Sequence, residues 1–394
     1  MNTKPQITTI GCSMQTIENL LHEKVKIDGI NIYALELPMK KPFRISVGEI
    51  TRKPLLILEI LSDGSSGYGE VAALPEPIYS AEDVETAKRM LTLLTPKLMK
   101  NGNVCYEDIL SVLSQYRGHN MAKAAIDYAF WYLLSKKLDF PLLSITNPSK
   151  TTFEVQESVP ILPKEKVSEW IEDAYSRGIK SIKIKIQPGH SWEIVKFVKD
   201  TLNPDFISVD ANGSFNPRNS NHLIELNKTA EYVDEIEQPF RPKNLYAHVK
   251  FLNDINSVVS LDESIENLDD AIEYAELSNS KGVINIKPPR VGGLYNSWIM
   301  ANEMRNVGVD CFVGGLLETS LGREFNMAIA GMKNVSEKYT SDFSPPSDFY
   351  KDDITYTSFD IKDGHVKIPE SRNVPFEVDK QKLAKYEKPL SAIA

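Results

Sequence analysis

Two lysines that alternate with isoleucine are the first residues of this chain to suggest chemistry. Lys183 and Lys185 lie within residues 181–186, which have the sequence SIKIKI. Period-two alternation predicts a β-strand with one apolar face and both ammonium groups on the other. A further lysine, Lys287, follows a later apolar run at 282–286. Two amino groups that approach one carbon from different sides can remove and return a proton, so the pattern suggests acid–base chemistry.

Three carboxylates follow strand-like runs in the segment between these lysines. They are Asp210 after residues 206–209, Glu237 after 232–236, and Asp262 after 257–261. Convergent carboxylates repel one another unless a cation neutralises them. A ligand set made only of oxygen atoms suits Mg²⁺, with Mn²⁺ as the usual substitute. We therefore predict a Mg²⁺ site formed by the three acids.

The elements that would position these groups alternate along the chain. Segments of helical length, such as 192–201 and 268–277, separate the strand-like runs. Alternating strands and helices predict βαβ units with a parallel sheet, and successive units of this size fit a closed barrel. Catalytic residues of such barrels lie at the C-terminal ends of several strands. We therefore expect the acids and the lysines to meet at one mouth of the barrel.

A divalent ion and two lysines suit the abstraction of a proton next to a carboxylate group. The ion would bind the substrate carboxylate, Lys185 would act as base, and Lys287 would stabilise the anion or return the proton. A lysine base must be neutral, so its pKa of about 10.4 has to fall. The metal ion and the neighbouring ammonium of Lys183 would both lower it.

Several motifs, taken in order, resemble the enolase superfamily in its muconate-lactonising branch. The lysine strand, the runs DAN (210–212), EQP (237–239) and DES (262–264), and the final lysine follow the family's order. Supporting motifs are KPPRVGG at 287–293, GGLLETSLGR at 314–323, PFRIS at 42–46, GYGE at 67–70, SDFY at 347–350 and DGHV at 363–366. Within the branch, the chain resembles the o-succinylbenzoate synthases and the N-acylamino acid (N-succinylamino acid) racemases from about residue 27 onward.

The resemblance implies an α/β fold, a TIM-like (β/α)7β barrel with an α+β capping domain. We expect an N-terminal extension at 1–26, a capping domain at 27–150, a catalytic barrel at 151–340, and a C-terminal segment at 341–394 that returns to the capping domain. The extension carries Leu20 and Leu21, which could lie on a short packed helix. A frayed tail is the favoured alternative.

The resemblance also implies roles for residues beside the lysines and acids. Asn212 and Glu263 are expected to orient the metal ligands. Glu318 would contact the substrate or the catalytic lysines. Arg44 and Ser46, in a capping-domain loop, would meet the distal end of an anionic substrate.

The chain departs from the family pattern at two positions. Pro289 and Ser320 stand where the family usually has glycine. Both are expected near the substrate, where they would narrow or reshape the pocket. Arg290, between these positions, is expected to be a structural salt-bridge partner.

The reaction implied by the resemblance is the dehydration of a cyclohexadiene carboxylate to o-succinylbenzoate, a step toward menaquinone. Racemisation of N-acylamino or N-succinylamino acids is the alternative, since both reactions begin with loss of the same α-proton. A dipeptide epimerase fits less well because the expected Asp-x-Asp is replaced by Asp342-Phe343-Ser344. Muconate cycloisomerisation fits the motif at 314–323 less well. A non-catalytic binding barrel would tolerate the loss of a metal ligand or of a catalytic lysine. Here all three acids and both lysines are present: Asp210, Glu237, Asp262, Lys185 and Lys287.

Composition agrees with a soluble enzyme of the cytoplasm. The chain has 394 residues and a net charge of −9, which disfavours nucleic acid and anionic membranes as partners. The three cysteines show neither paired nor metal-ligand spacing, which suits a reducing compartment. No apolar run is long enough to cross a bilayer. We expect a small-molecule carboxylate substrate and a homo-oligomeric assembly.

Overall fold

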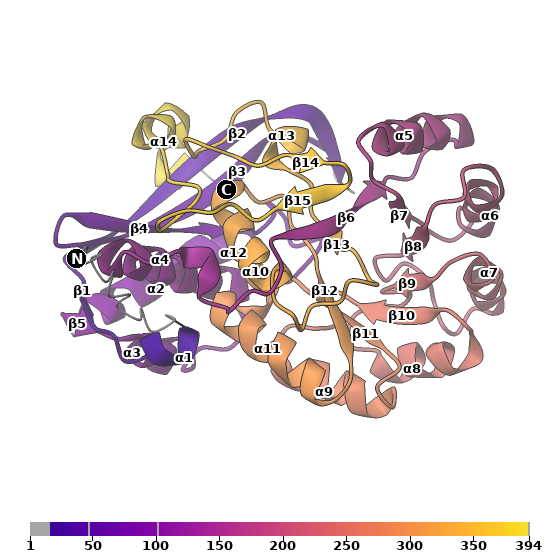
Figure 1. Cartoon of the computed structure of the whole chain (residues 1–394), viewed down its shortest axis with the longest axis horizontal. Helices are drawn as coiled ribbons and strands as arrows, with labels where there is room; N and C mark the ends of the chain where they lie inside the picture. The colour runs from indigo at the N-terminus through magenta and orange to yellow at the C-terminus, as the bar shows by residue number, and fades with distance from the viewer. Residues whose placement is uncertain (1–15, 46–47, 101, 393–394) are drawn as a thin grey trace, which may run out of the picture.

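The computed structural model describes residues 16–45, 48–100 and 102–392, and for 42–45, 48–50 and 392 it describes the backbone only. Figure 1 shows a capping domain beside a barrel, with the C-terminal segment, in yellow, running over both. Within the described ranges, no helix combines the length and the apolar character needed to span a membrane.

A four-stranded antiparallel sheet forms the centre of the capping domain. The strand order is β16, β2, β3 and β4. Their bounds are Glu387–Lys388 (β16), Gly29–Ile45 (β2), Gly48–Ser62 (β3) and Ser65–Val71 (β4). The tight turn between β3 and β4 contains Asp63 and Gly64, both with positive φ, as two-residue hairpin turns require.

Two helices pack on this sheet, and a third packs on one of them. The helices are α2 (Val84–Met99), α3 (Tyr106–Leu113) and α4 (Asn120–Leu138), and most residues of α4 are buried. Helix α4 packs directly on β4, because Gly67 and Gly69 leave room for its backbone. A Cβ at Gly69 would lie 1.9 Å from the carbonyl oxygen of Ala125, and one at Gly67 would lie 2.1 Å from that of Ala129. This close contact fixes the level at which β4 meets the barrel.

The described part of the N-terminal extension is packed, and the favoured prediction of a frayed tail is wrong for it. Helix α1 (Ile17–Leu20) buries Ile17 and Leu20, and the backbone N–H of Ile17 donates to the carbonyl oxygen of Ile145. Strand β1 (Val25–Lys26) then pairs with β5 (Asn103–Val104). Two apolar side chains on one helical face were enough to anchor this short helix.

Seven βα units and a final strand form the barrel. The strands are β6 (Thr152–Val159), β7 (Ser181–Lys185), β8 (Phe206–Asp210), β9 (Glu235–Glu237), β10 (Val258–Leu261), β11 (Val283–Ile286), β12 (Asp310–Val313) and β13 (Ser341–Asp342). Neighbours from β6 to β12 pair in parallel and in sequence order, and β13 pairs in parallel with β6. The backbone N–H of Val313 reaches Oγ of Ser341 and links β12 to β13. The predicted (β/α)7β fold is confirmed.

The barrel helices lie outside the strands, as Figure 1 shows. They are α5 (Lys164–Ser176), α6 (Trp192–Thr201), α7 (Ser220–Ala230), α8 (Leu245–Asp254), α9 (Leu268–Leu277), α10 (Pro288–Val291), α11 (Leu294–Asn306) and α12 (Ser320–Ala330). Most of them bury apolar side chains toward the strands, whereas the short α10 packs on α4 and α11, and α12 is buried along its whole length.

The C-terminal segment joins the barrel to the capping domain. Its elements are α13 (Pro346–Phe349), β14 (Ile361–Lys362), β15 (His365–Lys367), α14 (Lys380–Tyr386), β16 and a short 3₁₀ helix at Leu390–Ala392; another, Leu142–Ser144, follows α4. Strand β15 pairs with β6 of the barrel, whereas β16 pairs with β2 of the capping sheet. The two domains are therefore tied together by a segment that takes part in both sheets.

Candidate active site

The C-terminal strand ends bring the predicted lysines and acids to one mouth of the barrel. In the parallel register, Lys185 lies opposite Asp210, and Asp210 lies opposite Glu237. Asp262 and Lys287 are the first residues after β10 and β11. The lysines and acids that the sequence places at strand ends thus lie at one level of the barrel.

Lys185 and Lys183 differ in how open their side chains are. Nζ of Lys185 lies 2.5 Å from Oδ2 of Asp210, and 35% of the Lys185 side chain is exposed. Nζ of Lys183 lies 2.5 Å from Oε2 of Glu237, with only 2% of the side chain exposed. Lys183 is therefore held inside the barrel, and Lys185 is the member of this pair that a substrate can reach.

The buried charges at the mouth stabilise one another. Burial alone would raise the pKa of Asp210, but Lys185 and Lys183 hold this pKa below its ordinary value. Burial alone would lower the pKa of Lys183, but Glu237 and Asp342 raise it above the ordinary value. The surrounding opposite charges therefore favour the carboxylate form of Asp210 and the ammonium form of Lys183.

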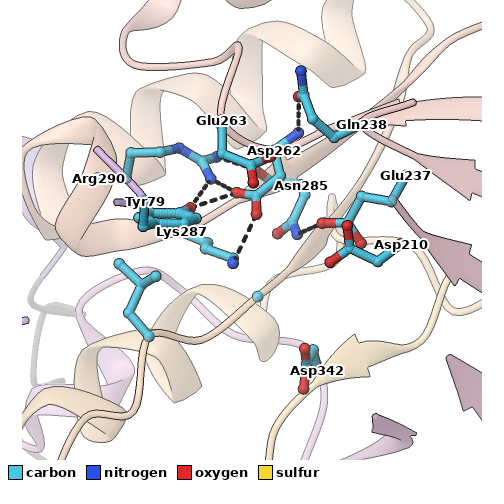
Figure 2. Close-up of polar contacts among 12 residues, drawn as sticks. Tyr79, Asp210, Glu237, Gln238, Asp262, Glu263, Asn285, Lys287, Arg290 and Asp342 are labelled. Carbon is cyan, nitrogen blue, oxygen red and sulfur yellow. Dashed lines mark hydrogen bonds and ion pairs between the residues drawn. The ribbon is translucent and has the colours of Figure 1, made fainter. Parts of the chain in front are cut away.

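Asp262 and Lys287 lie in a second, more enclosed network (Figure 2). Nζ of Lys287 is 2.9 Å from Oδ2 of Asp262, and Arg290 forms an ion pair with Oδ1. Tyr79 of the capping domain donates to Oδ1 over 2.7 Å and accepts from Nη1 of Arg290 over 2.9 Å. The Lys287 ammonium also lies 5.0 Å from the centre of the Tyr79 ring, within cation–π range. The expectation that Arg290 is a salt-bridge partner agrees with these contacts.

Glu237 is held from two sides below the mouth. Nδ2 of Asn285 donates to Oε1 over 2.7 Å, as Figure 2 shows. Lys183 binds the other oxygen. Asp342 at the end of β13 adds a second carboxylate 3.9 Å from Nζ of Lys183. Oδ1 of Asn285 is buried and has no hydrogen-bond partner among the described residues.

Asn212 and Glu263 lie beside the acids, as their sequence positions predict. Oδ1 of Asn212 accepts a hydrogen bond from Lys185 over 2.9 Å, and its Nδ2 donates to Oε1 of Glu263 over 3.0 Å. Burial raises the pKa of Glu263 to about 7, because the other oxygen, Oε2, is buried without a partner in the described chain. Asn212 thus connects the Lys185–Asp210 ion pair to Glu263, which follows strand β10.

Glu318 has a different environment from the one expected. Its carboxylate is buried and binds Arg323 (3.2 Å), Nδ2 of Asn326 (3.0 Å) and the backbone N–H of Leu316 (2.7 Å). These partners belong to the loop before α12 and to α12 itself. The structure therefore places Glu318 in the support of that loop and does not bring it to the lysines.

The other expected substrate contacts have mixed outcomes. Ser46 and the side chain of Arg44 lie outside the described residues. The hydroxyl of Ser320 donates to Asp353 over 2.5 Å and contacts Ser358. Ser320 therefore tethers α12 to the C-terminal segment instead of narrowing the pocket.

Sequence reasoning missed three polar residues of the site: Tyr79, Asn285 and Asp342. Asn285 lies two residues before Lys287 on β11, so strand periodicity would have placed both on the same inward face. Asp342 ends a strand of only two residues, which gives no detectable period. Tyr79 comes from a distant loop, and no local pattern connects it to Asp262.

The three predicted metal ligands each have a positively charged neighbour in this structure. Within the described part of the chain, no group of three or more His, Cys, Asp and Glu side chains is arranged so that it could hold a metal ion. The donor chemistry nevertheless suits a hard cation, since Asp210, Glu237 and Asp262 offer only carboxylate oxygens at one level of the barrel. The unpartnered Oε2 of Glu263 adds a further acceptor there. The metal site stays a prediction.

Two family matches cover most of the chain. Residues 29–145 match the mandelate racemase / muconate lactonizing enzyme N-terminal domain. Residues 166–381 match the enolase C-terminal domain-like family. The chain belongs to the enolase superfamily, in its mandelate racemase and muconate-lactonising branch, and the predicted family is confirmed.

Relatives with assigned activities fall into two groups. The chain is 29% identical over 364 residues to o-succinylbenzoate synthase of Bacillus subtilis, a match that covers 92% of this chain and 97% of the relative. It is 30% identical over 348 residues to N-succinylamino acid racemase of Thermus thermophilus, covering 88% and 93%. A solved enolase-superfamily structure from Listeria innocua superposes with a TM-score of 0.87 at 26% identity, covering 93% and 98%. The chain is thus similar to a lyase and to a racemase at nearly equal identity.

Proposed function

We propose that this protein is an o-succinylbenzoate synthase that removes an α-proton from a cyclohexadiene carboxylate and then eliminates water. The observation that carries the proposal is the placement of two lysines around the barrel. Lys185 belongs to β7 and Lys287 follows β11, four positions apart in the order of eight strands. Side chains so placed approach a central substrate from opposite sides. The three acid-bearing strands lie between them.

Asp210, Glu237 and Asp262 are the residues that we propose hold Mg²⁺, or Mn²⁺ in its place. When bound, such an ion supplies positive charge for the substrate carboxylate while the adjacent carbon loses its proton. Asn212 and Glu263 would keep the carboxylates oriented, because both contact the same group of strand ends.

Lys185 is the proposed base. Its side chain is the exposed member of the β7 pair, so it can approach the α-carbon of a bound substrate. Lys183 stays bound to Glu237 and contributes a fixed positive charge next to Lys185. Lys287, on the opposite side, would stabilise the anion as its charge develops.

N-succinylamino acid racemisation is the second candidate function. The same two lysines would serve as base and acid in turn, each for one enantiomer, and this requires amino groups on opposite sides of the substrate. The similarity to the Thermus thermophilus racemase supports this alternative. A non-catalytic binding barrel is disfavoured, because the chain has all three proposed metal ligands and both proposed catalytic lysines, Lys185 and Lys287. We also expect a cytoplasmic, homo-oligomeric enzyme of menaquinone biosynthesis.

The test compares kcat/KM for the cyclohexadiene carboxylate with kcat/KM for a panel of N-succinylamino acids, on one preparation with Mg²⁺. Dehydration is expected to be at least as efficient, because its substrate is compact and its elimination is strongly downhill. A preference of more than about tenfold for any N-succinylamino acid, equal to about 1.4 kcal/mol of transition-state binding, would reverse the ranking. Absence of both activities would contradict the assignment.

A further inference from the structure

The backbone of Gly314 packs against the side chain of Lys287. A Cβ at position 314 would lie 2.7 Å from Cε of Lys287 and 2.4 Å from Oδ1 of Asn285. Both distances are too short for real contacts, so any side chain at position 314 would displace the side chains of Asn285 and Lys287. The backbone N–H of Gly314 also donates to the carbonyl oxygen of Ile286, the residue before Lys287. The position of residue 314 therefore decides where the Lys287 ammonium can lie.

Gly314 begins a short loop, residues 314–319, whose conformation is not one that the loop would choose alone. Leu317 has a φ of +59°, in the left-handed region that a leucine rarely adopts. Such a conformation persists only where the surrounding structure holds it. Groups outside the loop must therefore hold it in this form.

Lys53 of the capping domain is one of these groups. Its Nζ donates to the carbonyl oxygen of the strained Leu317 over 3.1 Å, and Tyr350 donates to the same oxygen over 2.6 Å. Lys53 lies on β3 and is 1% exposed, so its ammonium is removed from water to make this contact. Burial of this lysine is costly, and the Leu317 carbonyl together with the nearby carboxylates of Glu70 and Glu318 offsets the cost.

Glu70 of the capping domain holds the other end of the loop. Its carboxylate accepts from the backbone N–H and hydroxyl of Thr319 and from the backbone N–H of Gly322, over 2.6–3.2 Å. These N–H groups belong to the start of α12, whose N-cap residue Thr319 provides no side-chain cap. Glu70 thus replaces the missing cap from another domain. Helix α12 and strand β4 lie together in Figure 1.

We propose that Lys53 and Glu70 are positioning residues that act through the loop 314–319 on Lys287. They hold the loop in its strained form, and Gly314 then fixes the lysine stem. The inference rests on the proposed function, since it assumes that Lys287 faces the reacting carbon. It also assigns the capping domain a role in aligning a barrel lysine, besides any contact with substrate.

The test uses Lys53→Met, Glu70→Gln and the double variant, which removes one positive and one negative charge together. The matched control is Glu82→Gln. Glu82 is also a buried glutamate of the capping domain and also binds the N-terminus of a helix, but this helix is α4 in its own domain, through Met121 and Ala122. Loss of Glu82 should cost stability without moving the barrel loop.

The readout is α-hydrogen exchange of N-succinyl-D- and N-succinyl-L-phenylalanine in D₂O with Mg²⁺. Lys287→Ala and Lys185→Ala identify which enantiomer depends on which lysine. We expect Lys53→Met and Glu70→Gln to slow the Lys287-dependent exchange about tenfold or more, because a misplacement of about 1 Å can cost about a hundredfold. The Lys185-dependent exchange should change less than about twofold. Equal loss of both exchanges, or loss of neither, would overturn the inference.

A second measurement separates failure of this inference from failure of the proposed function. Backbone amide exchange of residues 314–319, followed by mass spectrometry, should be faster in Lys53→Met and Glu70→Gln than in the wild type and in Glu82→Gln. Unchanged protection of this loop would overturn the inference even in an active enzyme. A wild type that neither exchanges α-hydrogens nor dehydrates would contradict the proposed function, and the amide measurement would still decide whether the capping domain holds the loop.

Discussion

The two sides of the barrel mouth hold their lysines in different ways. On the β7 side, Lys185 pairs with Asp210, and about a third of its side chain is open to solvent. On the β11 side, Lys287 is 9% exposed and is enclosed by Asp262 and the ring of Tyr79. Burial alone would lower the pKa of Lys287, but Tyr79 and nearby acids raise it above its ordinary value.

This difference shows how one side-chain type can be prepared for two tasks. A lysine with room to move can approach a carbon and take its proton, as we propose for Lys185. An enclosed ammonium provides charge at a fixed point, as we propose for Lys287, and a fixed charge acts without reorganisation during the reaction. Among the described residues, the capping domain contacts the enclosed side through Tyr79 and through the loop 314–319 that it holds.

The largest effect is expected from removing the metal, because that affects both sides together. Chelation should abolish turnover, and Mg²⁺ or Mn²⁺ should restore it. Asp210→Asn should weaken Mg²⁺ affinity, measured by calorimetry, with little change in melting temperature, since its partner Lys185 is solvated enough to lose the ion pair. Full activity in a metal-free preparation would contradict the proposed mechanism.

The next prediction separates the two lysines. Lys185→Ala should lower kcat for dehydration by about a thousandfold, within the range of about 10²–10⁴ for loss of an acid–base group. Lys287→Ala should cost less, about a hundredfold, since it removes one stabilising charge. In D₂O each variant should lose α-hydrogen exchange of one N-succinylamino acid enantiomer. Lys180→Ala is the control, because Lys180 is exposed and precedes the opposite end of β7. Near wild-type dehydration by Lys185→Ala would mean that the base is another residue.

How much of the site could be predicted from the sequence depends on how far apart in the chain the contacting residues lie. The lysines and acids were found because each ends a strand, and strand ends of a parallel barrel share one level. Tyr79, Lys53 and Glu70 were not found, because their contacts with the barrel join residues about 180 or more positions apart in the chain. The close approach of Gly314 to Lys287 could not be predicted either, because no periodic sequence pattern accompanies it. The sequence therefore predicted which groups meet, but not how differently each is held.

A smaller effect should come from Tyr79, and it should fall on one side only. Tyr79→Phe removes the hydrogen bonds to Asp262 and Arg290 but keeps the ring near Lys287. We expect a three- to tenfold loss, about 1 kcal/mol, in the Lys287-dependent exchange. Tyr79→Leu should lose more, because the cation–π contact of about 0.5–2 kcal/mol goes as well. Similar losses in the Lys185-dependent exchange would show that the two sides are not independent.

The smallest effect concerns stability and involves Glu324 of α12, which lies near Tyr132 of the capping domain and Phe376 of the C-terminal segment. Glu324 is wholly buried, and neither carboxyl oxygen has a hydrogen-bond partner of normal geometry within the described residues. Burial therefore raises its pKa well above the ordinary 4.5, although the backbone N–H of Phe376 favours the charged form. Because the folded state binds the proton more tightly, the stabilisation is complete below pH 4.5 and is lost as the pH rises through the raised pKa.

Glu324→Gln removes this titration while it keeps the size of the side chain. Urea unfolding at about pH 5, 7 and 9 should show wild-type stability falling with pH relative to the variant, by up to about 1.4 kcal/mol for each unit of pKa shift that has been crossed. At the lowest pH, the two proteins should differ by no more than about 1 kcal/mol, because both then carry a neutral group there. Glu172→Gln, at an exposed site on α5, should follow the wild-type curve. Parallel curves for the wild type and Glu324→Gln would show that the Glu324 carboxyl group finds a stabilising partner when it ionises.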